Sequence, residues 1–184
     1  MKVVVIQSSP NRDGLTAACA AAAVAGVKEA GAEVEDIRLN DLHIARCDAC
    51  DNGWGRCREN HECEGIQDDF QSLHSRVNAA NALVIVTPVY WGQPSECCKA
   101  FLDRYRRSEA TRGEKSALAG KYVLCVAAAG GSGNGAITSL SELERWCQHL
   151  RAERWDLIGI TRRSRSYKVD TIRQAAKAMV LAQP

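Results

Sequence analysis

The sequence lacks the features that mark several protein classes. Its 184 residues contain no apolar run close to the roughly 20 residues of a membrane-spanning helix. The formal net charge is only +2, which excludes a polybasic nucleic-acid arm and an acidic disordered tail as dominant features. The apolar start at residues 3–6 is too short for a secretory signal. These absences predict a cytoplasmic protein that binds neither a membrane nor nucleic acid.

Aromatic side chains are also scarce, at 5% of the residues in a chain rich in Ala and Val. This composition indicates a core that is packed tightly from small side chains. The length suits one domain with a sizeable core and leaves little room for a second. No internal repeat, low-complexity tract or linker divides the chain, so we expect a single domain over residues 1–184.

Short apolar runs alternate along the chain with segments of helical pattern. The pattern predicts strands at residues 3–6, 33–39, 82–87, 121–129 and 155–161. It predicts helices at residues 16–30, 68–80, 96–107, from the glycines at 130–135 to Leu150, and at 169–182. Five strand–helix pairs in strict alternation predict an α/β fold with a doubly wound parallel sheet. In such a sheet ligands bind beyond the carboxyl ends of the strands, so the loops after residues 6, 87 and 129 form the candidate site.

The loop after the first strand, residues 8–16, has the composition of an anion site. It places hydroxyl groups, the Arg12 guanidinium and backbone N–H groups at a helix N-terminus. It contains neither a Walker A sequence nor a G-x-G-x-x-G fingerprint, which argues against ATP and against a Rossmann-bound dinucleotide. The alternative is an ordinary helix start, with Asp13 or Thr16 as the capping residue.

The other two loops offer flat apolar surface and free backbone. Residues 88–95, predicted as a loop, hold Tyr90 and Trp91 among prolines and a glycine, which suits a planar heteroaromatic ring. Alternatively, the two aromatic side chains plug the end of the sheet or lie at a subunit contact. The glycine-rich residues 130–135 allow a ligand to approach the backbone closely, or they form only a flexible connection.

Two motifs in these loops carry a family resemblance. Residues 9–16 look like a Gly-Ser-Pro-Arg-x-x-Gly-x-Thr phosphate loop, with Ser8 in place of the Gly and Asn11 where Arg is common. Residues 88–92 together with 99–104 look like a Pro-Val-Tyr-Trp … Lys-x-Phe-x-Asp-Arg block. The whole chain thus resembles the NADPH-dependent FMN reductase group of flavodoxin-like proteins.

The resemblance implies a flavodoxin-like five-stranded parallel sheet in the order 2-1-3-4-5, with a cysteine-rich loop after the second strand, and bound FMN. It implies that the FMN phosphate contacts Ser9, Asn11, Arg12, Gly14, Leu15 and Thr16. It implies that the isoalloxazine ring lies beside Pro88, Val89, Tyr90, Trp91, Gly92, Gly130, Gly131 and Gly135.

Four of the nine cysteines crowd into residues 45–65, namely Cys47, Cys50, Cys57 and Cys63. Four thiolates so close together repel one another and oxidise readily unless a cation neutralises them. An iron–sulfur cluster on all four cysteines fits this pattern, and so does a structural zinc ion. His61 is an alternative to one thiolate, and free or disulfide-forming thiols are the remaining interpretation.

The cysteine segment also resembles a branch of the same family, the iron–sulfur flavoproteins. Cys47, Cys50 and Cys63, followed by Gln-Asp-Asp at 67–69, match the compact motif of that branch. Cys57 matches it only with an insertion at residues 51–54. The resemblance implies a [4Fe–4S] cluster held by the four cysteines.

The family implies an oxidoreductase whose chemistry resides in its cofactors, with no catalytic acid, base or nucleophile among its side chains. The implied donor is NAD(P)H, as a co-substrate, or reduced ferredoxin, and the redox partner is a small molecule or another protein. A homo-oligomer, dimer or tetramer, with the flavin near a subunit contact, is also implied. Two alternatives remain, a cluster-free NAD(P)H:FMN or quinone reductase with a structural cysteine loop and a flavodoxin-like electron carrier.

Other cysteines and histidines receive simpler interpretations. We expect four cysteines to be small core residues and Cys97, at the start of a helix, to be a candidate redox thiol. Three histidines have no partner at ligand spacing and are expected at the surface or as capping groups. The core cysteines are Cys19, Cys98, Cys125 and Cys147, and the histidines are His43, His74 and His149.

Overall fold

A parallel sheet runs through the centre of the computed structural model, which describes residues 1–183; Pro184, the last residue of the expected domain, lies outside them. Five strands lie side by side in the order β2-β1-β3-β5-β6, and the short β4 pairs only with β3. Counted without β4, this is the predicted order 2-1-3-4-5, and the flavodoxin-like fold class is confirmed. The strands are β1 (Lys2–Gln7), β2 (Glu33–Arg38), β3 (Ala82–Tyr90), β4 (Gln93–Pro94), β5 (Tyr122–Ala129) and β6 (Glu153–Thr161).

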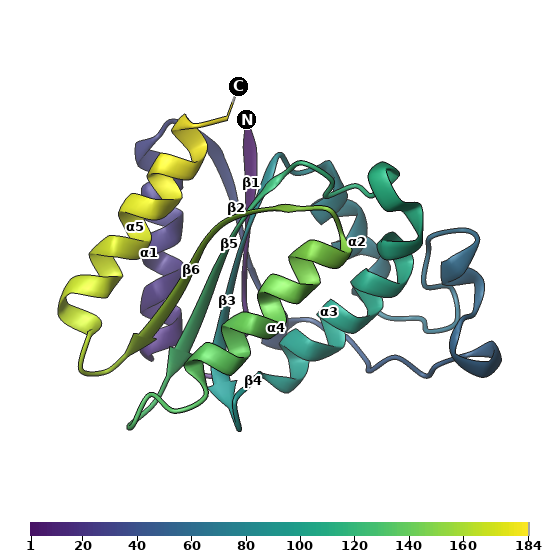
Figure 1. The fold of residues 1–184 in the computed structure, drawn as a ribbon, viewed down its shortest axis with the longest axis horizontal. Coiled ribbons are helices and arrows are strands. Elements are labelled where there is room, and N and C mark those ends of the chain that lie inside the picture. The colour runs from purple at the N-terminus through teal and green to yellow at the C-terminus, as the bar shows by residue number, and fades with distance from the viewer. Residues whose placement is uncertain (184) are drawn as a thin grey trace.

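Helices cover both faces of the sheet (Figure 1). On one face lie α1 (Leu15–Glu29) and α5 (Arg165–Leu181), and on the other lie α2 (Phe70–Ala79), α3 (Glu96–Glu109) and α4 (Ala136–His149). Short 3-10 helices follow β2, interrupt the cysteine segment and follow α3, at Leu39–Asp41, Asp51–Gly53, Arg56–Arg58 and Ala110–Lys115.

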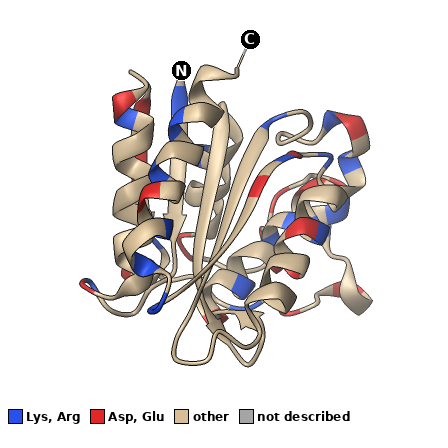
Figure 2. Cartoon of the chain, turned by 60° about the vertical axis from the view of Figure 1, so that its left-hand side comes forward, with Lys and Arg blue, Asp and Glu red and all other residues tan. Residues whose placement is uncertain are grey.

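The alternation of side chains along the strands supplies a separate core to each face. Val3 and Val5 of β1 pack toward α1 and α5, whereas Val4 and Ile6 pack toward the other three helices. Both faces are therefore buried, which explains why the central strands read as continuous apolar runs. Figure 2 shows the consequence, since the central strands β3 and β5 carry no charged residue, while Lys, Arg, Asp and Glu lie on the helices, the outer loops and the two edge strands β2 and β6. None of the helices in residues 1–183 has the length and hydropathy that crossing a membrane requires.

The segment predicted as a loop at residues 88–95 is in fact a β-hairpin. β3 continues to Tyr90, and β4 pairs with it antiparallel through Val89–Pro94 and Tyr90–Gln93. Trp91 and Gly92 form the two-residue turn, with φ values of 50° and 79°. Two-residue hairpin turns of type I′ require a positive φ at both central residues. The prediction was wrong because a bulky residue such as Trp91 is uncommon in a left-handed turn, so the sequence carries no signal for this hairpin.

The helices α2 and α5 begin at residues that differ from the predicted ones. α2 begins at Phe70 and not at Asp68, because Asp68 is paired with Arg104 and Asp69 accepts a hydrogen bond from the His43 backbone N–H at 2.7 Å. α5 begins at Arg165 and not at residue 169. Its exposed first turn carries no apolar pattern, and so the sequence did not reveal it.

His74 is buried, which contradicts the prediction of a surface or capping group. Its Nε2 lies 3.0 Å from Oε1 of Glu109, whose side chain is also fully buried. The other Glu109 oxygen accepts a hydrogen bond from the Ala117 backbone N–H at 2.7 Å. Burial alone would raise the pKa of Glu109, but the hydrogen bonds from His74 and Ala117, with the nearby Arg112 charge, outweigh it and hold the pKa below its usual value.

This lowered pKa predicts a specific loss of stability in acid. The folded chain binds the Glu109 proton less readily than the unfolded chain, so the contribution is complete above the unfolded pKa and is lost as the pH falls through the folded pKa. Glu109→Gln should lower the free energy of unfolding at pH 7 by about 1–3 kcal/mol. The difference from wild type should shrink toward pH 3 in urea unfolding experiments. Glu114→Gln, at an exposed position, is the control, and a difference that stays constant with pH would contradict the prediction.

Candidate functional site

The first two predicted loops meet at the carboxyl ends of β1 and β3. The Ser8 backbone N–H donates to the Val86 carbonyl at 3.1 Å, and the Ser8 hydroxyl donates to Thr87 Oγ1 at 3.0 Å. Thr87 Oγ1 also accepts a hydrogen bond from the Ser95 backbone N–H at 3.0 Å. In this strand order the chain changes direction between β1 and β3, which is where doubly wound sheets of this topology bind their ligand.

The N-terminus of α1 is free of any side-chain cap. Gly14 occupies the N-cap position, and neither Asp13 nor Thr16 accepts a hydrogen bond from a backbone N–H of the first turn, so the interpretation as an ordinary capped helix is wrong. The first backbone N–H groups of α1 are left without intrahelical partners. Together with the positive end of the helix dipole, they form an anion seat at the switch point.

Arg38, at the end of β2, is a basic residue of this region that the sequence analysis missed. Its Nη2 donates to the Ser9 carbonyl at 3.2 Å, and its Nε makes no hydrogen bond within residues 1–183 but lies 3.4 Å from Asp41 Oδ2 in an ion pair. Arg12, predicted to contact phosphate, is largely exposed and pairs with Asp41 at 3.0 Å. A basic residue at the carboxyl end of the strand beside β1 was the available signal, because parallel strands end at the same edge.

The hairpin and the glycine-rich loop form one wall. A Cβ added at Gly135, where φ is 82°, would lie 2.5 Å from the Gly92 Cα and 2.9 Å from the Gly92 N. A shallow depression between the loops is lined by Val89, Trp91, Gly92, Asn134, Gly135 and Thr138. No charged residue occurs in residues 82–95 or 122–141. The wall is therefore neutral, in contrast to the phosphate loop.

The aromatic side chains of the hairpin face solvent. Trp91 is fully exposed and Tyr90 is partly exposed, so the two do not plug the end of the sheet. Ile137, expected on the apolar face of α4, is 85% exposed and lies in the first turn after the glycine-rich loop. Apolar surface is thus available beside the depression.

The cysteine segment lies beside α3, away from the hairpin (Figure 1). All four cysteines predicted as ligands line one small cavity, together with Asp48, Gly53, Gly55, Ile66, Arg104 and Arg107. Cys50 is exposed, although Gly65 approaches it, since a Cβ added at Gly65 would lie 3.2 Å from the Cys50 sulfur. His61 does not line this cavity, and its Nδ1 lies 3.1 Å from the Ser108 carbonyl.

The electrostatics of the cavity disfavour four free thiolates. Burial, followed by the neighbouring Cys63 and Cys47, raises the pKa of Cys57 above its usual value. Burial also raises the pKa of Cys63, although a hydrogen bond from Arg104 opposes the change. Within residues 1–183 no three His, Cys, Asp or Glu side chains converge closely enough to hold a single metal ion.

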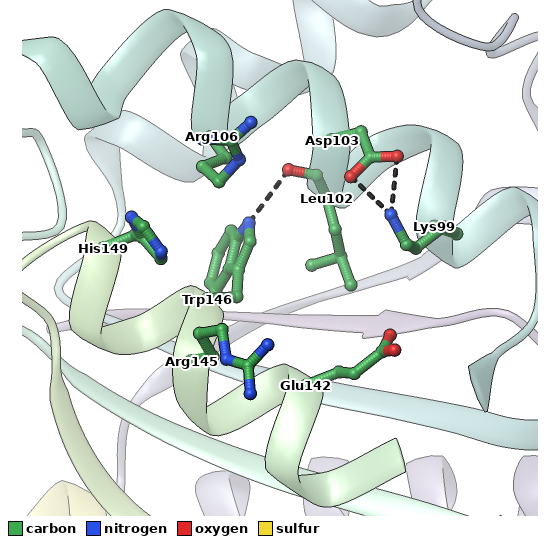
Figure 3. Close-up of a pocket in the computed structure, with 8 residues that line it drawn as sticks. All are labelled: Lys99, Leu102, Asp103, Arg106, Glu142, Arg145, Trp146 and His149. Atoms are coloured by element: carbon green, nitrogen blue, oxygen red, sulfur yellow. Dashed lines mark hydrogen bonds and ion pairs between the residues drawn. The ribbon is translucent and has the colours of Figure 1, made fainter. Parts of the chain in front are cut away.

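The residues at 99–104 of α3, which carry part of the family resemblance, divide between two surfaces. Lys99 and Asp103 form an ion pair at 2.6 Å and face a groove between α3 and α4. Figure 3 shows this groove, in which the Trp146 indole donates to the Leu102 carbonyl at 3.0 Å. Arg104 points to the opposite side, into the cysteine cavity. Neither surface belongs to the three loops at the end of the sheet.

The five cysteines outside the cysteine segment differ in burial. Cys19, Cys98, Cys125 and Cys147 are buried core residues, as expected. Cys97 is half-buried beside the phosphate loop, with its sulfur 3.3 Å from the side-chain amide of Asn40 and 3.8 Å from the Ser8 carbonyl oxygen. Its predicted redox role stays a prediction.

Comparisons with known proteins agree with this geometry. A family model described as NADPH-dependent FMN reductase matches residues 1–153. An iron–sulfur flavoprotein from Methanosarcina thermophila is 27% identical over 146 residues, which are 79% of this chain and 72% of that protein. An iron–sulfur flavoprotein from Methanocaldococcus jannaschii is 32% identical over 106 residues, which are 58% of this chain and 52% of that protein. The match therefore spans only about half the length of the second relative.

A solved structure supports the fold along the whole chain. The NAD(P)H:quinone oxidoreductase from Methanothermobacter marburgensis superposes with a TM-score of 0.77 at 18% sequence identity, covering 100% of this chain and 97% of that one. At this level of identity the likeness concerns the arrangement of the helices and strands.

Proposed function

The chain belongs to the NADPH-dependent FMN reductase family, and we propose that this FMN-dependent oxidoreductase carries a [4Fe–4S] cluster and works as an iron–sulfur flavoprotein. In this proposal it exchanges electrons between a reduced donor, NAD(P)H or ferredoxin, and a small-molecule or protein acceptor. When bound, FMN supplies electron exchange in pairs or singly, and an iron–sulfur cluster supplies single-electron exchange. The protein supplies binding, orientation and electrostatics.

The observation that carries the FMN site is the uncapped N-terminus of α1 at the β1–β3 switch point. Its N–H groups and the basic side chains nearby suit a phosphate, while the neutral wall opposite suits an apolar ring. Proposed phosphate contacts are Ser9, Asn11, Arg12, Gly14, Leu15 and Thr16, with Arg38 behind them. Proposed ring contacts are Pro88, Val89, Tyr90, Trp91, Gly92, Gly130, Gly131 and Gly135.

Arg12 should contribute only modestly to phosphate binding. Its side chain is 74% exposed and shares its charge with Asp41, and exposed ion pairs contribute about 0.2–1 kcal/mol. Arg12→Ala should therefore weaken FMN binding about two- to fivefold in a fluorescence titration. Binding of riboflavin, which lacks the phosphate, should not change. An equal loss for both ligands would contradict a phosphate contact at Arg12.

The cluster proposal is supported by the donor set of the cysteine cavity. Cys47, Cys50, Cys57 and Cys63 are four soft ligands around one space, next to two guanidinium groups that offset negative charge. A four-iron core stands between its thiolates, so their sulfurs need not meet at a single point. Three of the four cysteines are half-buried and Cys50 is exposed, which leaves the cavity open to the delivery of a cluster.

The direct test is anaerobic purification followed by analysis of flavin, iron and acid-labile sulfide. The proposal expects one FMN and about four irons and four sulfides per chain, with broad absorption near ~400 nm beyond that of the flavin. Bound FMN with rapid NADPH oxidation and no iron would select the cluster-free reductase instead. The cluster-free reductase remains the second candidate function, because no three His, Cys, Asp or Glu side chains of the described residues converge on one metal position.

The electron partners and the assembly belong to the same proposal. We expect a homo-oligomer, dimer or tetramer, with the exposed hairpin side chains near a subunit contact. Comparing the rates of flavin reduction by NADH, NADPH and reduced ferredoxin identifies the donor, and sedimentation gives the oligomeric state. A colourless protein that does not take up added FMN would overturn the proposal.

A further inference from the structure

Arg104 is a fully buried arginine that the FMN site does not use. Its guanidinium forms a two-nitrogen ion pair with Asp68, with Nη1 at 2.5 Å from Oδ2 and Nη2 at 3.0 Å from Oδ1. It also lies 4.2 Å from the centre of the Phe70 ring. Neither side chain of the ion pair is exposed. Burying two charges costs several kcal/mol per ion before pairing, so this arrangement calls for a specific reason.

The ion pair closes the base of the cysteine segment. Asp68 Oδ2 accepts a hydrogen bond from the Ala45 backbone N–H at 2.8 Å, and Arg104 Nη1 donates to the Ala45 carbonyl at 3.2 Å. Asp68 Oδ1 accepts another from the Phe70 backbone N–H at 3.0 Å. The residues before the first cysteine and after the last are thereby held against α3. This contact is structural and would be sufficient to anchor the loop.

One donor of Arg104 goes beyond that anchoring role. Its Nε–H donates to the Cys63 sulfur at 3.3 Å. The ion pair with Asp68 and the bond to Ala45 use only the two Nη atoms, so the anchoring does not require this contact. Hydrogen bonds to ligand sulfurs orient them and tune the reduction potential of iron–sulfur clusters.

We propose that Arg104 is a positioning residue of the cysteine site, which fixes the Cys63 sulfur and donates a hydrogen bond to it in the metal-loaded protein. This role rests on the proposed cysteine ligands. Donation to a ligand sulfur stabilises the more negative, reduced form of a cluster and so raises its reduction potential. It also holds the fourth ligand in place for any soft metal that the four cysteines bind.

Arg107 provides a matched control in the same cavity. Its guanidinium donates to the Gly53 carbonyl and lies 5.1 Å from the centre of the Trp54 ring. Among the described contacts it makes no hydrogen bond to a cysteine sulfur. Arg107 thus supplies a nearby positive charge without the sulfur contact that distinguishes Arg104.

The test compares Arg104→Lys with Arg107→Lys, because both keep the charge. A lysine has one nitrogen on a flexible stem and cannot bind Asp68 with two nitrogens while donating to Cys63 with a third. In redox titrations followed by electron paramagnetic resonance, Arg104→Lys should lower the cluster potential by about 59 mV, a tenfold change for one electron. Arg107→Lys should keep the wild-type potential. A wild-type potential in Arg104→Lys, or equal shifts in both variants, would overturn the proposal.

A second measurement keeps the proposal testable if Arg104→Lys does not fold or does not hold iron. Arg107→Lys protein labelled with ¹⁵N-arginine keeps Arg104 as the guanidinium that lines the cavity, and it should show a ¹⁵N hyperfine coupling in the reduced, paramagnetic cluster. The absence of this coupling would overturn the role of Arg104. If the wild type contains no iron and no sulfide, the cluster proposal fails by itself. The role of Arg104 is then decided by titration with Cd²⁺ alone, followed by sulfur-to-cadmium absorption. Arg104→Lys should bind Cd²⁺ about tenfold more weakly than wild type and Arg107→Lys, and equal affinities would overturn it.

Discussion

Gly135→Ala should separate the hairpin from the glycine-rich loop and weaken FMN binding at least tenfold. The added methyl group would lie 2.5 Å from the Gly92 Cα and 2.9 Å from the Gly92 N. Both atoms belong to the backbone, so no side-chain rotation relieves the overlap. The left-handed conformation at Gly135 adds about 1–2 kcal/mol of strain for a residue with a Cβ, and overpacking adds about 1–3 kcal/mol.

These contributions predict a loss of about 2–5 kcal/mol in the free energy of unfolding. For a chain of this size the midpoint of thermal unfolding should fall by at least about 5 °C. Gly120→Ala is the control, because it has a similar positive φ of 71°, no heavy atom within 4 Å of the added Cβ, and a position before β5, at the other end of that strand from the glycine-rich loop. It should lose only the strain contribution and keep wild-type FMN affinity. A Gly135→Ala protein with wild-type FMN affinity and thermal stability would show that the two loops do not depend on this contact.

The sequence predicted the fold well because the strands that define it are buried on both faces. The apolar runs around Val3–Ile6 and Ala82–Thr87 leave no alternative to covered parallel strands, and their carboxyl ends then bring the three loops together. The prediction failed where backbone conformation decided the outcome. Trp91 in a left-handed turn is uncommon for a bulky residue, and so the hairpin was interpreted as a loop.

The residues that support the loops of the candidate site could not be predicted from local sequence patterns. Arg38 and Arg104 stand far in sequence from the loops they support, at residues 8–16 and 45–65, and only the packing of β2 and α3 brings them there. His74 of α2 likewise contacts Glu109 of α3, a residue far from it in the sequence. A pattern along one chain reports periodicity and local composition, whereas these contacts depend on tertiary distances.

Cys50→Ala should remove the iron and sulfide while the protein keeps its FMN. Cys50 lines the cysteine cavity beside α3, and none of the residues around that cavity lies in the three loops at the end of the sheet. Three remaining thiolates cannot complete a four-cysteine site. FMN affinity should stay within about twofold of wild type, a difference below 0.5 kcal/mol. Loss of both cofactors would show that the two sites are not separate.

Cys57→Ala tests the ligand that matched the family motif only with an insertion. Because Cys57 lines the same cavity as the other three cysteines, its removal should abolish the cluster as completely as Cys50→Ala does. His61→Ala should keep the iron and sulfide, because that ring lies outside the cavity, against the Ser108 carbonyl. Cys97→Ala is the control for a thiol near the phosphate loop and should also retain them. Full iron content in Cys57→Ala together with its loss in His61→Ala would replace the fourth sulfur ligand by an imidazole, and the cysteine segment would then have to fold differently around its metal.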